Sequence, residues 1–196
     1  MTLQQFIKQY DKPGAVVLLE GKRKVAEEDK PKLVELGRHL ATETTHMIFR
    51  SGNASGSDAF FSEGVVSVDH KRLEVITPYD GHRKKTNKAF KTISLDEVNL
   101  DGEESIIEYS KENKKTKNLV DKYLEGSRNR FTIKASYIIR DTIKAIGTKD
   151  IPPTTFGIFY DDLCDPMAGG TGHTMNICKL NNIPFINQEE WFGWLG

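Results

Sequence analysis

The sequence MIFRSGNASGSD, residues 47–58, places a short apolar run directly before a turn of glycine, serine and asparagine residues. Met47-Ile48-Phe49 is typical of a short buried strand, and the stretch from Asp58 to Val68 can form a helix. A glycine-rich turn at this point lets the backbone approach a ligand and leaves amide groups exposed at the start of the helix. The stretch therefore predicts a strand–turn–helix unit of an α/β fold.

The same order of strand and helix occurs on both sides of this unit. Val16-Val17-Leu18-Leu19 is a continuous apolar run, which predicts a central strand buried on both faces. A helix is expected from about Glu27 to Thr42, with Pro31 in its first turn. Leu73-Glu74-Val75-Ile76 predicts a third strand. Because strands and helices alternate, we expect a parallel sheet with right-handed crossovers.

The middle of the chain breaks this alternation. The stretch from Tyr79 to Asn99 is polar and carries a cluster of basic residues. These are Arg83, Lys84, Lys85, Lys88 and Lys91. Two helices are expected after it, from Glu103 to Leu124 and from Phe131 to Ile146. We interpret about 79–150 as a polar and helical insertion that lies outside the sheet.

The alternation resumes near the end of the chain. Thr155 to Tyr160 and Ile183 to Ile186 predict two strands, separated by a short helix from Thr174 to Leu180. A closing helix is expected from Glu189 to Leu195. The sequence thus predicts a Rossmann-like open parallel sheet of five strands in the order 3-2-1-4-5, with helices on both faces. We expect residues 1–196 to form a single domain.

Composition and charge exclude several classes of protein. The 196 residues are 37% hydrophobic and 29% charged, which is enough apolar material for a packed core. Lys+Arg 28 equals Asp+Glu 28, so no overall field attracts a polyanion, and any nucleic-acid binding would be local. No apolar run approaches the roughly 20 residues that span a bilayer, and the sequence MTLQQFIKQYDKPG at the start does not resemble a signal peptide. We expect a cytoplasmic protein with no membrane partner.

The cysteines and tryptophans are given structural roles. Cys164 and Cys178 are too few for a disulfide framework and lack the spacing of a zinc site, so both are expected to be reduced, packed thiols. Trp191 and Trp194 are expected to anchor the closing helix in the core. Nothing in the sequence predicts a metal or a cofactor.

Three loops that each follow a predicted strand carry the candidate ligand site. They are rich in glycine, and parallel strands bring such loops together at the carboxyl ends of the strands. The candidate ligand-binding residues are Gly21, Arg23, Ser51, Gly52, Asn53, Gly56, Ser57, Asp58, Gly169, Gly170, Thr171, Gly172, His173 and Thr174. We expect four of the glycines, Gly52, Gly56, Gly170 and Gly172, to lie around one pocket.

Single residues in these loops have both a functional and a structural interpretation. Arg23 can bind a phosphate with two hydrogen bonds, or can simply be solvated. Asp58 can contact ribose hydroxyls or can cap a helix. His173 can bind a phosphate or act as an acid, and a purely structural role fits equally well. Tyr79 and His82 can stack on a base or cover a sheet edge.

The loops do not match two common nucleotide motifs, but they resemble a third group. No Gly-x-Gly-x-x-Gly follows the first strand, and no loop ends in Gly-Lys-Ser/Thr. Residues Ser51 to Asp58, followed by Glu63-Gly64-Val65, resemble the Ser-Gly-x-Ala-x-Gly-x-Asp signature of the DNA-processing protein A family and the wider SLOG superfamily. The turn at Gly21-x-Arg23 and the loop from Gly169 to Thr174 are similar to the superfamily's other two motifs. The resemblance covers about 14–78 and 153–195 and implies a Rossmann-like nucleotide pocket.

This superfamily includes the LOG phosphoribohydrolases, which release the base from nucleoside monophosphates, and domains that sense nucleotide-derived signals. LOG enzymes carry Pro-Gly-Gly-x-Gly-Thr-x-x-Glu, whereas here Ala168 precedes the glycines, His173 stands at the first threonine position and Asn176 at the glutamate position. The carboxylate needed to stabilise an oxocarbenium-like centre is therefore missing from its usual place. The residues that could replace it are Glu20, Asp58, Asp161 and Asp165.

Three functions follow from these observations. The first is a non-catalytic protein that senses or sequesters a nucleotide-derived phosphorylated small molecule, which explains complete glycine loops without the glutamate. The second is a nucleotide N-glycosidase with a relocated carboxylate. The third is single-stranded DNA binding, which the neutral net charge disfavours and the basic run from Arg83 to Lys91 favours. A homo-oligomer is left open.

Overall fold

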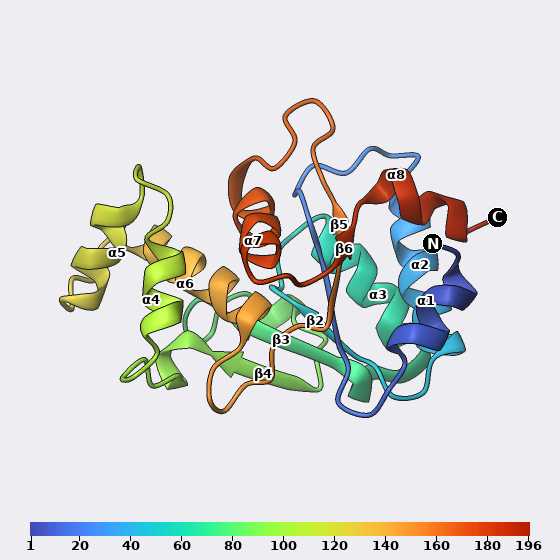
Figure 1. The fold of residues 1–196 in the computed structure, drawn as a ribbon, viewed down its shortest axis with the longest axis horizontal. Coiled ribbons are helices and arrows are strands. Elements are labelled where there is room, and N and C mark those ends of the chain that lie inside the picture. Colours follow the sequence, from blue (N-terminus) through green and yellow to red (C-terminus); the bar gives the residue numbers. More distant parts are fainter.

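The computed structural model describes residues 1–196, and its centre is a parallel sheet of six strands (Figure 1). The strands lie in the order β4-β3-β2-β1-β5-β6, and all neighbours run parallel. The strand bounds are β1 Val16–Gly21, β2 Ile48–Ser51, β3 Leu73–Thr77, β4 Lys91–Ser94, β5 Phe156–Tyr160 and β6 Phe185–Ile186. The predicted parallel α/β fold is confirmed, and the apolar run of β1 is central because it pairs with β2 on one side and β5 on the other.

Eight α-helices surround this sheet. They are α1 Leu3–Tyr10, α2 Lys30–Glu43, α3 Ser57–Asp69, α4 Glu104–Ser110, α5 Lys117–Leu124, α6 Ile133–Ile146, α7 Gly169–Leu180 and α8 Gln188–Trp191. The first of them was not predicted. It begins with a capping box, in which the side chain of Thr2 accepts from the Gln5 N–H and the Gln5 side chain accepts from the Thr2 N–H.

The predicted number of five strands is wrong, because β4 adds a sixth. This strand pairs parallel to β3, with Glu74 opposite Lys91 and Thr77 opposite Ser94. Its first two residues are exposed, so its sequence lacks the apolar run that marks the inner strands. The five predicted strands keep the predicted order. The region of about 79–150 was expected to lie outside the sheet, but it contributes β4 to the sheet. The assignment of the chain to a single domain stays a prediction.

The helices of this region differ in how closely they follow the sequence pattern. The helix expected from Glu103 to Leu124 is two helices, α4 and α5, which residues 111–116 separate. In Figure 1, α4 and α5 lie at one end of the molecule, and both chain termini lie at the other end. The following helix, α6, packs Ile139 and Ile143 in one cluster with Ile76 of β3, so α6 covers one face of the sheet.

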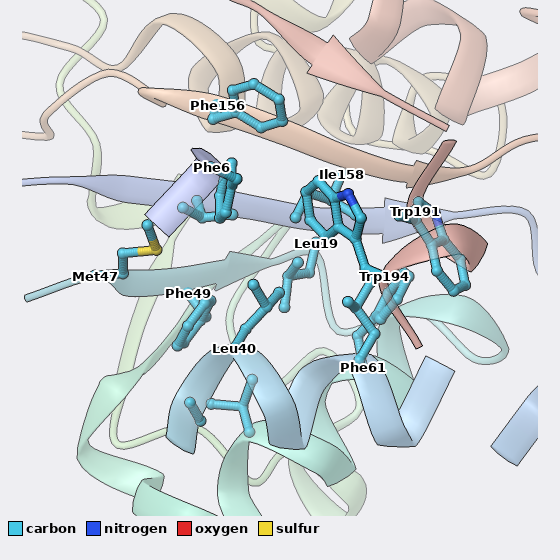
Figure 2. Packing of buried hydrophobic residues seen from close by; sticks show 14 of the residues in the cluster. Phe6, Leu19, Leu40, Met47, Phe49, Phe61, Phe156, Ile158, Trp191 and Trp194 are labelled. Carbon is cyan, nitrogen blue, oxygen red and sulfur yellow. The ribbon is translucent and has the colours of Figure 1, made fainter. Parts of the chain in front are cut away.

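The main core lies on the opposite face of the sheet. Side chains alternate along β1, so Val17 and Leu19 belong to this core and Leu18 points to the α6–α7 side. Figure 2 shows the aromatic and aliphatic side chains that pack here between the sheet and the helices. The expected core positions of Trp191 and Trp194 are confirmed, since they are 0% and 8% exposed.

The two cysteines differ in their surroundings. Cys178 is buried in the cluster formed by Leu18, Phe159 and α7, as expected, but Cys164 is exposed. The expectation of two packed thiols is thus wrong for Cys164, because this residue lies in the surface segment between β5 and α7. None of the helices combines the length and the apolar character that a bilayer crossing needs.

Candidate functional site at the carboxyl edge of the sheet

The loops after β1 and β2 are held together by the carboxylate of Asp58. Its Oδ1 accepts from the Gly21 N–H at 3.3 Å, and its Oδ2 accepts from the Gly52 N–H at 3.1 Å and the Ala54 N–H at 3.3 Å. The Asp58 residue is 1% exposed. Both oxygen atoms are therefore engaged by backbone donors, and in this structure Asp58 organises the two loops.

The turn at Gly56 brings the same two loops into backbone contact. Gly56 has φ +87°, and a Cβ atom there would overlap the carbonyl oxygen of Arg23. The hydroxyl of Ser57 donates to the Lys22 carbonyl at 2.7 Å. The side chain of Arg23 is exposed and has no acidic group within 4 Å, so it is free to bind an anion.

The segment after β3 joins these loops from the other side. Asn53, which has φ +55°, donates from Nδ2 to the His82 carbonyl at 3.4 Å. Arg83 donates from Nη2 to Ser55 Oγ at 3.4 Å and also has no acidic partner. The loops that follow the first three strands therefore meet at one place on the carboxyl edge.

Three aromatic rings lie beside these arginines. The ring of His82 meets Tyr79 and Tyr137 edge-on, with centroid distances of 5.1 Å and 5.6 Å. Tyr137 comes from α6, so a helix far along the chain completes the group. We call the set of Arg23, Arg83, Tyr79, His82 and Tyr137 the arginine–aromatic cluster.

The electrostatics of His82 place it in the neutral form at pH 7. Burial lowers its pKa, and the positive charges of Arg140, Arg83 and Arg23 lower it further, to about 4. The hydroxyl of Tyr137 lies 3.2 Å from His82 Nε2. The Nδ1 atom of His82 is buried and has no partner in the protein, so it is a polar atom that a ligand could satisfy.

Helix α6 contributes charged groups that the sequence analysis did not identify. Arg140 donates from Nη1 to the carbonyl oxygens of Gly52 at 2.7 Å and Ile76 at 3.3 Å. One turn further along α6, Lys144 lies 2.7 Å from Glu20 Oε2 and 2.9 Å from Asp141 Oδ1. Charged residues on α6 thus bind the ends of β1, β2 and β3 together.

Glu20 is the buried carboxylate at the end of β1. Burial raises its pKa to about 7, and the negative charges of Asp141 and Asp58 act in the same direction against the attraction of Lys144. The Thr174 hydroxyl donates to Glu20 Oε1 at 3.2 Å. Through this hydrogen bond the glycine loop after β5 is linked to the end of the central strand.

A cavity of about 560 Å³ opens between α6 and α7, and we call it the α6–α7 cavity. It is lined by Glu112, Asn113, Thr116, Ile138, Asp141, Met167, Gly169, Gly170, Gly172, His173 and Asn176. Gly170 and Gly172 belong to this lining, whereas Gly52 and Gly56 do not, and a shared ligand pocket of the four glycines stays a prediction. The guanidinium of Arg140 packs against Gly52 and donates to its carbonyl oxygen at 2.7 Å.

The start of α7 forms one wall of the α6–α7 cavity. The helix begins at Gly169, within the glycine run, rather than at Thr174 as predicted. Thr171 is buried, and the Nε2 atom of His173 lies 3.1 Å from the hydroxyl of Thr142. Burial lowers the pKa of His173, which makes its ring neutral at pH 7. His173 therefore offers the cavity a polar ring without a charge.

The carboxylates proposed as substitutes for the missing glutamate lie elsewhere. Glu20 and Asp58 are buried and bonded, Asp161 is buried and accepts from the Met167 N–H at 3.1 Å, and Asp165 is exposed. None of the four lines the α6–α7 cavity. The lining does include Asn176, as the sequence motif implies, and the carboxylates of Asp141 and Glu112, which sequence reasoning missed. No group of three or more His, Cys, Asp or Glu side chains is arranged to hold a metal.

Comparison with known proteins gives a similarity of fold. A solved structure of DNA processing protein A from Helicobacter pylori, described for its unique single-stranded DNA binding mode, matches this chain with a TM-score of 0.55 and 16% sequence identity. The match covers 92% of this chain and 67% of that chain. No family model matches the sequence, and no curated protein matches it. The chain thus has a fold like that of DNA processing protein A.

Proposed function

We propose that the protein binds a nucleotide-derived phosphorylated small molecule at the carboxyl edge of its sheet, as a sensor or sequestering protein. The observation that carries this proposal is the arginine–aromatic cluster. Arg23 and Arg83 are cations without acidic partners, and they lie beside Tyr79, His82 and Tyr137. A phosphate can bind to the arginine guanidinium groups, and a base can stack on the aromatic rings.

The phosphate is assigned to Arg23 and Arg83. A planar guanidinium makes two parallel hydrogen bonds to phosphate oxygen atoms, and both side chains are exposed. The loop that carries Arg23 is fixed by Asp58 and by the contact between Gly56 and Arg23, and the segment that carries Arg83 is held by the hydrogen bond from Asn53 to the His82 carbonyl. Little backbone order therefore has to be gained on binding. This preorganisation supports a specific site.

The test is a ligand panel followed by substitution of Arg23. Nucleoside monophosphates, NAD, ADP-ribose and cyclic dinucleotides are added to the pure protein, and both the thermal shift and the release of free base are measured. We expect a shift without base release. Base release would contradict a purely binding role, and the absence of any shift would contradict the proposal.

Titration calorimetry then assigns the phosphate contact. A hydrogen bond to a charged group contributes about 1.5–3 kcal/mol, so Arg23→Ala should weaken binding roughly tenfold to a hundredfold. Arg23→Lys should recover part of the loss, because it keeps the charge and loses the planar fork. The matched control is Lys71→Ala, which removes an exposed cation before β3, at the opposite edge of the sheet. Unchanged affinity in Arg23→Ala would exclude Arg23 from the site.

Single-stranded DNA is the second candidate ligand, and the fold match favours it. The basic run after β3 supplies fewer free charges than its sequence indicates, because Lys88 lies 3.9 Å from Glu63 and Lys91 lies 2.8 Å from Glu74. Arg83, Lys84 and Lys85 remain unpaired, and Arg23 adds a fourth cation. Four phosphate contacts would give a slope of about −3 for log affinity against log salt. Fluorescence anisotropy with a labelled single-stranded oligonucleotide measures that slope, and a slope near zero excludes this candidate.

A further inference from the structure

The α6–α7 cavity adjoins the arginine–aromatic cluster along α6, because Tyr137 of the cluster and Asp141 of the cavity lie one helical turn apart on the same helix face. The lining of the cavity carries no lysine or arginine. Its volume of about 560 Å³ suits a small molecule, since ligand pockets typically measure about 300–1,000 Å³. Two walls are α6 and the start of α7, and Glu112, Asn113 and Thr116 between α4 and α5 form the third. The region of about 79–150 thus encloses part of the carboxyl edge of the sheet.

The polar group that defines this cavity is the carboxylate of Asp141. The residue is 5% exposed, and its Oδ1 lies 2.9 Å from Lys144 Nζ and 3.0 Å from Arg140 Nε. The other oxygen, Oδ2, accepts no hydrogen bond from the protein and lies 3.3 Å from the position that a Cβ atom on Gly170 would take. Burial alone would raise the pKa of Asp141, but the charges of Arg140 and Lys144 hold it below its ordinary value. An ionised acceptor therefore faces the glycine turn.

This carboxylate decides what the cavity can bind. The start of a helix attracts anions, but Asp141 Oδ2 is an acceptor without a proton and the carboxylate of Glu112 lies on the same lining, so phosphate oxygen atoms would find no hydrogen-bond donor at these two side chains. A ligand cation is not favoured either, because Arg140 and Lys144 already lie beside the carboxylate of Asp141 and compensate its charge. What remains is a neutral group that donates hydrogen bonds, and hydroxyl groups fit this description.

We propose that the α6–α7 cavity binds the ribose of a nucleotide-derived ligand, with Asp141 Oδ2 accepting hydrogen bonds from its hydroxyl groups. This inference rests on the proposed function and adds a preference for ribonucleotides over 2′-deoxyribonucleotides. A carboxylate that accepts from a ribose 2′-hydroxyl is a general device of nucleotide sites in α/β folds. Asp58, which the sequence suggested for this contact, is fully engaged by backbone donors. The neutral His173 and the amide of Asn176 line the same space.

The experiment compares each of the four nucleoside 5′-monophosphates with its 2′-deoxy form by titration calorimetry. For the wild-type protein we expect the ribose form to bind about tenfold to a hundredfold more tightly, because a hydrogen bond to a charged acceptor is lost in the deoxy form. Asp141→Asn should bring the ratio of ribose-form to deoxy-form affinity several-fold closer to one. The affinity for the deoxy form should change less than the affinity for the ribose form. Glu104→Gln, which neutralises an exposed carboxylate on α4 that does not line the cavity, is the matched control and should retain the ratio.

A second variant guards against misfolding of Asp141→Asn, because that change also weakens an ion pair with Lys144. Gly170→Ala leaves the pair intact and places a methyl group 3.3 Å from Asp141 Oδ2, with nothing else within 4 Å. It should lower the ratio while the unfolding curve stays unchanged. Equal binding of ribose and deoxyribose forms by the wild-type protein, or an unchanged ratio in both variants, would overturn this inference alone. Failure of every nucleotide to bind would overturn the proposed function and this inference with it.

Discussion

Replacing Glu20 with glutamine should change how the stability of the protein depends on pH. Burial raises the pKa of Glu20 from 4.5 to about 7 in the folded protein. Between these two values the folded state binds more protons at this site than the unfolded state does. The contribution of Glu20 to stability is therefore largest at low pH and is lost as the pH rises from about 4.5 through 7.

The expected size follows from the same two values. One pKa unit corresponds to about 1.4 kcal/mol, so the change from 4.5 to about 7 amounts to about 3 kcal/mol. Glu20→Gln keeps a side chain that can accept from Lys144 and Thr174 but does not titrate. The free energy of unfolding of Glu20→Gln minus that of the wild-type protein should thus increase by about 3 kcal/mol between pH 4 and pH 8.

Urea titrations at a series of pH values measure this difference. The fluorescence of Trp191, which is fully buried, reports unfolding. His82 has the opposite effect on the pH dependence of stability, because its lowered pKa makes stability rise with pH. This contribution is the same in the wild-type protein and in Glu20→Gln, so it cancels in their difference. Glu112→Gln, at an exposed position, should run parallel to the wild-type protein. A difference between Glu20→Gln and wild type that stays constant across the pH range would refute the reasoning.

Three other predictions test the site and the core. Gly170→Leu should block ligand binding with little change in melting temperature, whereas Gly172→Ala should lower stability by about 1–3 kcal/mol, because its methyl group would overlap the Met167 carbonyl. Thermal unfolding with and without ligand separates the two outcomes. Glu74→Leu should cost about 3–5 kcal/mol in urea unfolding, because it removes the carboxylate 2.8 Å from the fully buried Arg50, and adding Arg50→Met should restore part of the loss. A thiol reagent should modify one cysteine per native chain, the exposed Cys164, and a second only after denaturation, since burial raises the pKa of the other thiol to about 12.

The inner strands of the sheet could be predicted because their side chains are buried on both faces. The run from Val16 to Leu19 is apolar without interruption, and such a run has few alternatives to a central strand. The edge strand β4 could not be predicted in this way, because Lys91 and Thr92 are exposed and its pairing with β3 depends on backbone hydrogen bonds. Hydrophobic patterning reports burial, and an edge strand buries little.

The candidate site also has a part that could be predicted from the sequence and a part that could not. The glycine loops could be found because their residue types follow directly from local backbone requirements. Arg140, Asp141 and Lys144 could not, because charged residues on a helix usually lie on its solvated face, and here they meet loops that are distant in sequence. A signal was present in retrospect, since these charges interrupt an otherwise apolar helix between Ile138 and Ile146. That these three charged side chains face the sheet is seen only in the three-dimensional structure.

The position of β1 has a consequence for the protein during its own synthesis. β1 pairs with β2 on one side and with β5 on the other, where Val17 lies opposite Phe156 and Gly21 opposite Tyr160. The strand β5 is therefore translated long after β2. A ribosome adds about 5–20 residues per second, which leaves one edge of this apolar strand open in the nascent chain for on the order of ten seconds. An unpaired strand edge is a template for association with other chains. Slower translation therefore lengthens the period in which this strand edge is exposed to association with other chains.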